Sequence, residues 1–376
     1  MAVTSPASVA IVHDYLNQPG GAERVVLEMA RIWPAATIYT SLYRADSTFP
    51  EFRDRRLRTS FLDGLPVDGG FRRLFPLYPA AFRSFGRLPE NLVISSSSGW
   101  AHGVRVAPGS FHAVYCYTPA RWLYRTGSYR SRKMRALDPA LAPMRRWDRA
   151  AAHRADLYIA ISHEVGRRIR RHYGIDAPVV YPPVDVERFR PRPRGDRLLV
   201  VSRLLSYKRV DLAVDAATRA GIALDVVGTG PMFDDLRRRA GPTVAFHGRL
   251  PDGEVTDLME SCRAFLLPGE EDFGITPVEA NAAGKPVVAF ARGGAVETQQ
   301  DGRSGALFEV QTVDAVLDAV ARCDAIDTAP DQLAAMAKRF STERFRERLR
   351  AVLSASSRPA HHDGGRTARA LPAARR

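Results

Sequence analysis

Residues 268–286 read PGEEDFGITPVEANAAGKP, a segment in which a helix start, a helix stop and several carboxylates lie close together. Thr276 suits the N-cap, Pro277 the first helical position and Glu279 the glutamate of a capping box, so the pattern predicts a helix that begins here. Gly284 is expected to end this helix. The rest of the chain reads most easily as a scaffold around it.

The expected helix start is also a candidate anion site. Its free amides and positive dipole end would face Phe273, Gly274 and Ile275, and a glycine lets a ligand approach the backbone. Glu271 and Glu279 flank this site. Since carboxylates repel a phosphate, they are expected to accept hydrogen bonds from neutral sugar and ribose hydroxyls. The plain alternative, in which Glu279 only caps its helix and Glu271 is solvated, stays open at this point.

Composition indicates a globular protein with more than one domain. A chain of 376 residues, 45% hydrophobic and 26% charged, is too long for one typical core. Its first 15 residues lack the features of a signal peptide and no apolar run is long enough to span a membrane, so we expect a cytoplasmic protein. The three cysteines are widely spaced and are expected to be reduced and structural.

The net charge of +14 suggests an anionic partner. Residues 121–194 alone contain 18 Arg or Lys against 7 Asp or Glu. The chain has no nucleic-acid-binding motif, so no nucleic acid is expected. Residues 71–85 combine aromatic and basic side chains that could rest on an anionic membrane surface, although a stripe facing the core is the alternative.

Short apolar runs alternate with helical patterns along most of the chain, which predicts parallel sheets covered by helices on both faces. The expected fold class is α/β, with two doubly wound domains facing each other across a cleft. The expected strands are 8–12, 36–40, 92–95, 113–117, 157–162, 179–181, 198–201, 223–227, 244–246, 264–267 and 287–290, and the expected helices include 164–172, 210–220, 233–239, 255–261, 277–283 and 341–354. The domains are expected at 1–185 and 186–340, followed by a helix at 341–355 that packs back on the first domain and a disordered tail at 356–376.

Two cations follow the expected strand 198–201. Arg203 can hold a phosphate with two parallel hydrogen bonds, and Lys208 supplies a compact charge. Lysine is scarce here, with 4 of the 55 basic residues. The two side chains are expected to converge on one ligand, and a pair of solvated surface cations is the alternative.

Glycine turns and strand ends form the rest of the expected rim. Gly20 and Gly21 follow the first strand, where backbone amides could face a phosphate. Gly230 belongs to GTGP, which lacks the third glycine of a dinucleotide fingerprint and is interpreted as a tight turn. Arg249 and Leu250 end another strand, where backbone groups could recognise a nucleobase.

Together these residues resemble the retaining glycosyltransferases of family 4, which have the GT-B fold. The resemblance implies two Rossmann-like domains, of which the first binds the acceptor and the second a nucleotide sugar. It covers most of residues 8–340 and rests on Gly20–Gly21, YPPVD at 181–185, VSRLLSYKR at 201–209, GTGP at 228–231, HGRL at 247–250 and EEDFGITPVEANAAGKPVV from 270 onward.

The resemblance also implies roles for these residues. Glu279 would bind the ribose diol and Glu271 the donor sugar, while Arg203, Lys208 and the amides of residues 274–275 would neutralise the leaving diphosphate without an obligatory metal. Glu271 would then not be a covalent nucleophile. The catalytic candidates are Glu271, Arg203 and Lys208, and the donor-binding candidates are Gly20, Gly21, Gly230, Arg249, Leu250, Phe273, Gly274, Ile275, Thr276 and Glu279.

Two local stretches, HDYLNQPGGAERV at 13–25 and CYTPARW at 116–122, resemble O-antigen and polysaccharide mannosyltransferases. This implies a hexose donor such as GDP-mannose and a glycan or lipid-linked acceptor at the inner membrane face. Those relatives carry histidine where this chain has Tyr117, so Tyr117 or another residue, with His102 and His112 nearby, would contact the sugar. A nucleotide-sugar epimerase and a non-catalytic nucleic-acid binder are the competing interpretations.

Overall fold

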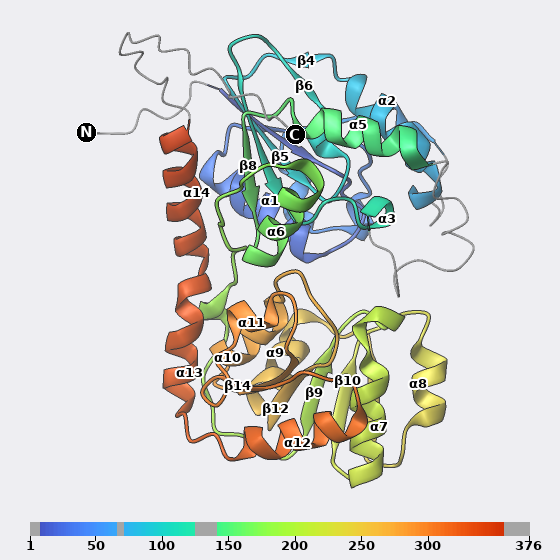
Figure 1. The fold of residues 1–376 in the computed structure, drawn as a ribbon, viewed down its shortest axis with the longest axis vertical. Coiled ribbons are helices and arrows are strands. Elements are labelled where there is room, and N and C mark those ends of the chain that lie inside the picture. The colour runs from blue at the N-terminus through green and yellow to red at the C-terminus, as the bar shows by residue number, and fades with distance from the viewer. Residues whose placement is uncertain (1–7, 66–70, 125–140, 357–376) are drawn as a thin grey trace, which may run out of the picture.

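The computed structural model describes residues 8–65, 71–124 and 141–356, and these form two α/β units, one above the other in Figure 1. Each unit is built on a six-stranded sheet in which every pairing between neighbouring strands is parallel. The strand orders are β3-β2-β1-β5-β7-β8 and β11-β10-β9-β12-β13-β14. The expectation of two doubly wound parallel sheets is therefore confirmed.

The first unit contains strands β1 (Val9–His13), β2 (Thr37–Thr40), β3 (Leu57–Thr59), β5 (Leu92–Ser97), β7 (Phe111–Cys116) and β8 (Leu157–Ala160), a short pair formed by β4 (Arg87–Leu88) and β6 (Arg105–Val106), and helices α1 (Gly21–Ile32), α2 (Tyr78–Arg83), α3 (Arg121–Tyr124), α5 (Ala142–Ala152) and α6 (His163–Tyr173). The sheet order reverses direction between β1 and β5. In open α/β sheets a ligand binds beyond the carboxyl ends of the strands at such a reversal.

The second unit contains strands β9 (Leu198–Val201), β10 (Leu224–Val227), β11 (Val244–Gly248), β12 (Ala264–Leu267), β13 (Val287–Phe290) and β14 (Gly305–Phe308), and helices α7 (Val210–Ala220), α8 (Phe233–Arg239), α9 (Asp252–Ser261), α10 (Ile275–Ala282), α11 (Ala295–Thr298), α12 (Val313–Asp324) and α13 (Pro330–Ala337). Its central strands β9, β10 and β12 are almost completely buried, because helices cover both faces of the sheet. Here the order reverses between β9 and β12.

The chain crosses between the units twice. The expected strand at 179–181 is wrong, because Val179 makes only an isolated bridge to Ala160 before the chain passes to the second unit. The return crossing leads into α14 (Thr342–Ser356), on the left in Figure 1. There the Arg346 guanidinium lies 2.6 Å from the Glu28 carboxylate of α1. Helix α14 thus packs on the first unit, and the tail expected after it lies outside the described residues from 357 onward.

The aromatic residues of α2 face the interior. Tyr78 and Phe82 are fully buried, and the Tyr78 ring stacks on Trp100 with their centroids 4.9 Å apart. Phe75 and Leu77, just before α2, remain 38% and 41% exposed. No helix in the described ranges is long and apolar enough to span a membrane.

Candidate active site

Helix α10, at the centre of the expected site, begins earlier than the capping rule predicts. Gly274 is its N-cap, with a φ of +86°, and no side chain caps its first turn. Thr276 therefore lies inside the helix and the predicted capping box with Glu279 is wrong. A glycine in the left-handed region turns the chain directly into the helix, so no capping side chain is needed. Gly284, with a φ of +75°, follows the last turn as expected.

A second glycine pair holds the segment before α10. The amide of Gly294 donates to the carbonyl oxygen of Glu271 at 2.8 Å. Gly293 has a φ of +64°, and a Cβ placed on it would overlap with that same carbonyl oxygen. A Cβ on Gly294 would overlap with the backbone of Phe273. Only a side-chain-free turn after β13 can therefore support residues 271–274 at this distance.

The structure brings together two of the three predicted catalytic residues. The ammonium of Lys208, in the turn after β9, is in direct contact with the carboxylate of Glu271, after β12. Their side chains are 14% and 18% exposed, so both remain partly accessible. An ammonium has three N–H donors, so Lys208 can bond Glu271 and a ligand oxygen at once.

Arg203 is placed differently from Lys208. It lies in the same loop after β9 but is exposed, and its guanidinium has no partner among the described residues. The structure does not bring Arg203 and Lys208 into contact with one another, and their expected convergence on one ligand stays a prediction.

Glu279 is the second carboxylate of the motif and is 12% exposed. Burial raises its pKa, and the nearby Arg188 guanidinium, with a nitrogen 3.6 Å from the Glu279 carboxylate, opposes this shift. Arg188 lies in the crossing segment between the units and was not predicted as a site residue. Its only signal in the sequence is its position three residues after the end of the YPPVD motif.

Replacing Glu279 by glutamine is expected to stabilise the fold at neutral pH. A carboxyl with a raised pKa contributes stability that is present below its unfolded pKa and lost as pH rises through its folded pKa. The variant removes this loss, so its melting temperature should exceed that of the wild type near pH 7, and the difference should shrink toward pH 4. Thermal denaturation at both pH values measures this, with the exposed Glu309→Gln as a control. An equal shift at both pH values would contradict the expectation.

The glycine loop of the first unit reaches the start of α10. Gly20 is the N-cap of α1 and Gly21 its first residue. A Cβ on Gly21 would lie 2.8 Å from the Cδ1 atom of Ile275, the first residue of α10. The loop after β1 and the loop after β12 thus meet, which places the carboxyl ends of the two sheets face to face.

The remaining candidates of the second unit follow neighbouring strands. Gly230, after β10, packs against the loop after β9, since a Cβ on it would lie 2.5 Å from the carbonyl oxygen of Leu204. Arg249 and Leu250 follow β11, where the arginine is exposed and the leucine packs partly buried against the core. These three residues therefore lie at the carboxyl edge of the second sheet.

The hydroxyl of Tyr117, at the position where the resemblance implies a sugar contact, is already bonded to other residues of the first unit. Its hydroxyl donates to the carbonyl oxygen of Ala22 at 3.0 Å and is 2.9 Å from the Ser96 hydroxyl. Burial raises the pKa of Tyr117 well above its usual value. Tyr117 therefore supports the first turn of α1 from within the first unit.

The two histidines near Tyr117 in sequence are structural. His112 is 1% exposed and its Nε2 lies 2.8 Å from the Ser95 hydroxyl. Burial lowers its pKa to about 3, so it is neutral. His102 is also buried, with its Nε2 3.2 Å from the Asp148 carboxylate.

A pair of polar side chains at the two ends of the glycine loop was not predicted from the sequence. His13 ends β1, and its Nε2 lies 3.8 Å from a carboxylate oxygen of Glu23 in α1. Both side chains are almost fully buried, and His13 Nε2 and Glu23 Oε2 have no hydrogen-bond partner within the described residues. A histidine at the end of the first strand was the available signal.

Within the described ranges no group of three or more His, Cys, Asp or Glu side chains could hold a metal ion. All three cysteines are buried and free.

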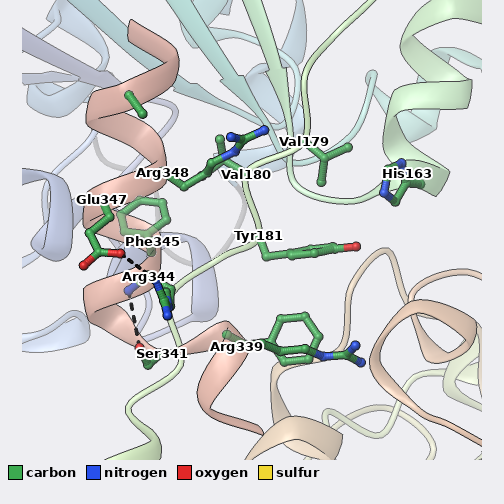
Figure 2. Close-up of a pocket in the computed structure, with 12 residues that line it drawn as sticks. His163, Val179, Val180, Tyr181, Arg339, Ser341, Arg344, Phe345, Glu347 and Arg348 are labelled. Carbon is green, nitrogen blue, oxygen red and sulfur yellow. Dashed lines mark hydrogen bonds and ion pairs between the residues drawn. The ribbon is translucent and has the colours of Figure 1, made fainter. Parts of the chain in front are cut away.

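A cavity of about 550 Å³ lies where the chain crosses between the units. Figure 2 shows Tyr181 of the crossing segment between His163 of α6 and Arg339, with Arg344 and Arg348 projecting from α14. None of the predicted site residues lines it. The candidate site is therefore the facing carboxyl edges of the sheets, not this cavity.

Comparison with known proteins identifies the family of both units. The family model described as "Glycosyltransferase Family 4" matches residues 19–188, and "Glycosyl transferases group 1" matches residues 185–339. Together they cover both units.

Two curated relatives match part of the chain. A GDP-mannose-dependent alpha-(1-6)-phosphatidylinositol monomannoside mannosyltransferase of Mycobacterium tuberculosis is 35% identical over 199 residues, which cover 44% of this chain and 52% of that protein. A D-inositol 3-phosphate glycosyltransferase of Geodermatophilus obscurus is 33% identical over 245 residues, covering 54% and 53% respectively. The chain spans about half the length of the curated relatives it matches.

Solved structures share the fold over nearly the whole chain. Anabaena HepE in complex with UDP is 17% identical with a TM-score of 0.70, covering 93% of this chain and 100% of that one. Sucrose-phosphate synthase from Thermosynechococcus elongatus is also 17% identical, with a TM-score of 0.73, covering 92% and 98%. With both family models and both sheets accounted for, the chain belongs to glycosyltransferase family 4 and has the GT-B fold.

Proposed function

We propose that this protein transfers a hexose, with retention of configuration, from a nucleoside diphosphate sugar to a glycan or lipid-linked acceptor. The observation that carries the proposal is the contact between the Lys208 ammonium and the Glu271 carboxylate, three residues before the uncapped start of α10 at Gly274. A cation, a hydrogen-bond acceptor and free helix amides are thus adjacent, as a sugar diphosphate requires.

Each part of the donor has a matching group in this arrangement. The diphosphate would bind the amides at the start of α10 together with Lys208 and Arg203, and the ribose diol would bind Glu279. The sugar hydroxyls would donate to Glu271, whose other contact is the Lys208 ammonium. Negative charge that develops on the leaving diphosphate would be stabilised by the cations and amides held in place around it, which lowers the activation barrier of transfer. In this proposal a metal ion is not required.

Mannose is the proposed sugar and GDP-mannose the proposed donor. The Mycobacterium tuberculosis relative, 35% identical, is named as GDP-mannose-dependent, and this name supports the proposal of mannose. The Anabaena HepE structure contains UDP, but at 17% identity it supports only the fold.

The proposed place of action is the cytoplasmic face of the membrane, in polysaccharide or glycolipid synthesis. The net charge of +14 would attract an anionic leaflet, and Phe75 and Leu77 offer exposed apolar side chains on the first unit. Lipid-linked acceptors would be reached from that surface.

A melting screen tests the donor before any acceptor is known. We expect GDP-mannose to raise the melting temperature more than UDP-glucose or ADP-glucose, since a ligand at 100 times its Kd stabilises by about 2.7 kcal/mol. Free mannose at the same concentration is the control. A screen in which no nucleotide sugar raises the melting temperature would overturn the proposal. In a separate product analysis, a nucleotide sugar of unchanged mass with one inverted sugar stereocentre would favour an epimerase.

A further inference from the structure

Helix α6 of the first unit docks on the segment that carries Glu271. The hydroxyl of Ser162, which precedes α6, accepts from the amide of Val165 at 3.1 Å and donates to the carbonyl oxygen of Asp272 at 2.6 Å. The same hydroxyl therefore caps α6 as a hydrogen-bond acceptor and joins this helix to the second unit as a hydrogen-bond donor.

Two arginines of the first unit bind the carboxylates on either side of Glu271 in sequence. Arg168 of α6 lies 2.8 Å from Glu270, and its guanidinium also contacts Asp272. Arg121 of α3 contacts the other oxygen of Asp272. Although burial raises it, the net pKa of the Asp272 carboxyl is lowered by these two guanidinium groups, so the buried group stays ionised.

A further carboxylate joins the same helix to the second unit. Glu297 of α11 accepts hydrogen bonds from the amides of His163 and Glu164 at 2.8 and 2.9 Å. These are free amides of the first turn of α6, where a negative charge is favoured by the helix dipole. The start of α6 is therefore bonded by both the loop after β12 and helix α11.

The directions of the side chains in this segment alternate. Glu270 and Asp272 meet Arg168, while Glu271, which lies between them in sequence, meets Lys208. An isolated parallel bridge to Gly293 holds the backbone of Glu271 between these two sets of contacts.

We infer that Arg168 and Arg121 are positioning residues for sugar transfer, which hold the Glu271 carboxylate in register with Lys208 by binding its two neighbours. The geometry of the donor site in the second unit then depends on contact with the first unit. The inference rests on the proposed function for its effect on turnover, but the positioning itself is a property of the free protein.

The test uses the full chain with three variants. Arg168→Ala removes the guanidinium. Arg167→Ala is the matched control, because Arg167 lies on the same helix, is 65% exposed and, among the residues that the structure describes, forms an ion pair only with Glu164. In Arg168→Ala the buried Asp272 carboxylate loses one of its two arginine partners, which should lower stability. The double variant Arg168→Ala/Asp272→Asn removes that charge as well, so its kcat reports the loss of positioning without the loss of stability.

For Arg168→Ala we expect kcat to fall at least about 10-fold with the KM for the donor within about 3-fold, and Arg167→Ala to match the wild type. Amide hydrogen exchange in residues 270–275, measured without any ligand, should accelerate about 10-fold in Arg168→Ala and should stay at the wild-type rate in Arg167→Ala. The double variant should regain melting temperature but not kcat.

Two results would overturn the inference. One is wild-type exchange rates in residues 270–275 of Arg168→Ala, whatever its activity. The other is full recovery of kcat in the double variant, which would mean that Arg168 only stabilises the fold. If the wild type itself transfers no sugar, the proposed function fails, while the exchange experiment still decides whether Arg168 positions the segment.

Discussion

Lys208→Ala is expected to lower sugar transfer at least about 100-fold, the size of effect seen when one preorganised group that stabilises developing charge is removed. The variant loses the ammonium that contacts Glu271 and that would neutralise the leaving diphosphate. It also leaves Glu271 without its cation, so the carboxylate would repel the donor phosphates. Because both side chains are mostly buried, at 14% and 18% exposed, the melting temperature should also fall, and turnover is therefore compared at a temperature where both proteins are folded.

Steady-state kinetics with the donor found in the melting screen measures this effect. Lys338→Ala is the matched control, since Lys338 is an exposed lysine of the same unit, outside the site. Turnover by Lys208→Ala within about 3-fold of the wild type would contradict the assigned role, because so small a change is less than 1 kcal/mol of transition-state stabilisation.

Gly293→Ala is expected to cost about 3 kcal/mol or more and to abolish donor binding. Its Cβ would overlap with the carbonyl oxygen of Glu271, a backbone atom that cannot move aside as a flexible side chain would. The substitution must therefore push away the segment between β12 and α10.

Gly302→Ala isolates the cost of backbone strain from the cost of overlap. Gly302 has a φ of +73°, close to the +64° of Gly293, but a Cβ there would meet no atom within 4 Å. We expect it to lose about 1 kcal/mol, as a non-glycine residue in the left-handed region does, and to bind the donor normally. Chemical denaturation of both variants measures the difference. Equal losses in the two would show that overlap with Glu271 is not the cause.

Local patterns predicted much of the second unit. The observed bounds of β9, β12 and β13 are those expected for 198–201, 264–267 and 287–290, because runs of buried apolar residues between turns have few other solutions. β14 and the helices α12 and α13 were not predicted. In the first unit β3 was missed as well, since its three residues include only one apolar side chain.

The start of α10 shows where a local rule fails. Thr276, Pro277 and Glu279 fit the capping pattern, yet the helix begins at Ile275 behind Gly274. The turn at residues 293–294 holds the preceding segment by its carbonyl oxygen, and this contact comes from another strand. A capping rule that considers only neighbouring residues in the sequence does not include this contact.

The sequence by itself determined the two parallel sheets, the family resemblance and the segment that carries Glu271, because periodicity and motifs are local properties of the chain. Only the tertiary structure decided which side chains contact these residues. Lys208 meets Glu271 across 63 residues and Arg121 meets Asp272 across 151, and Tyr117 turned out to support α1. Such pairs depend on which strand ends the topology places side by side, and nothing in the spacing of charged residues along the chain specifies that arrangement.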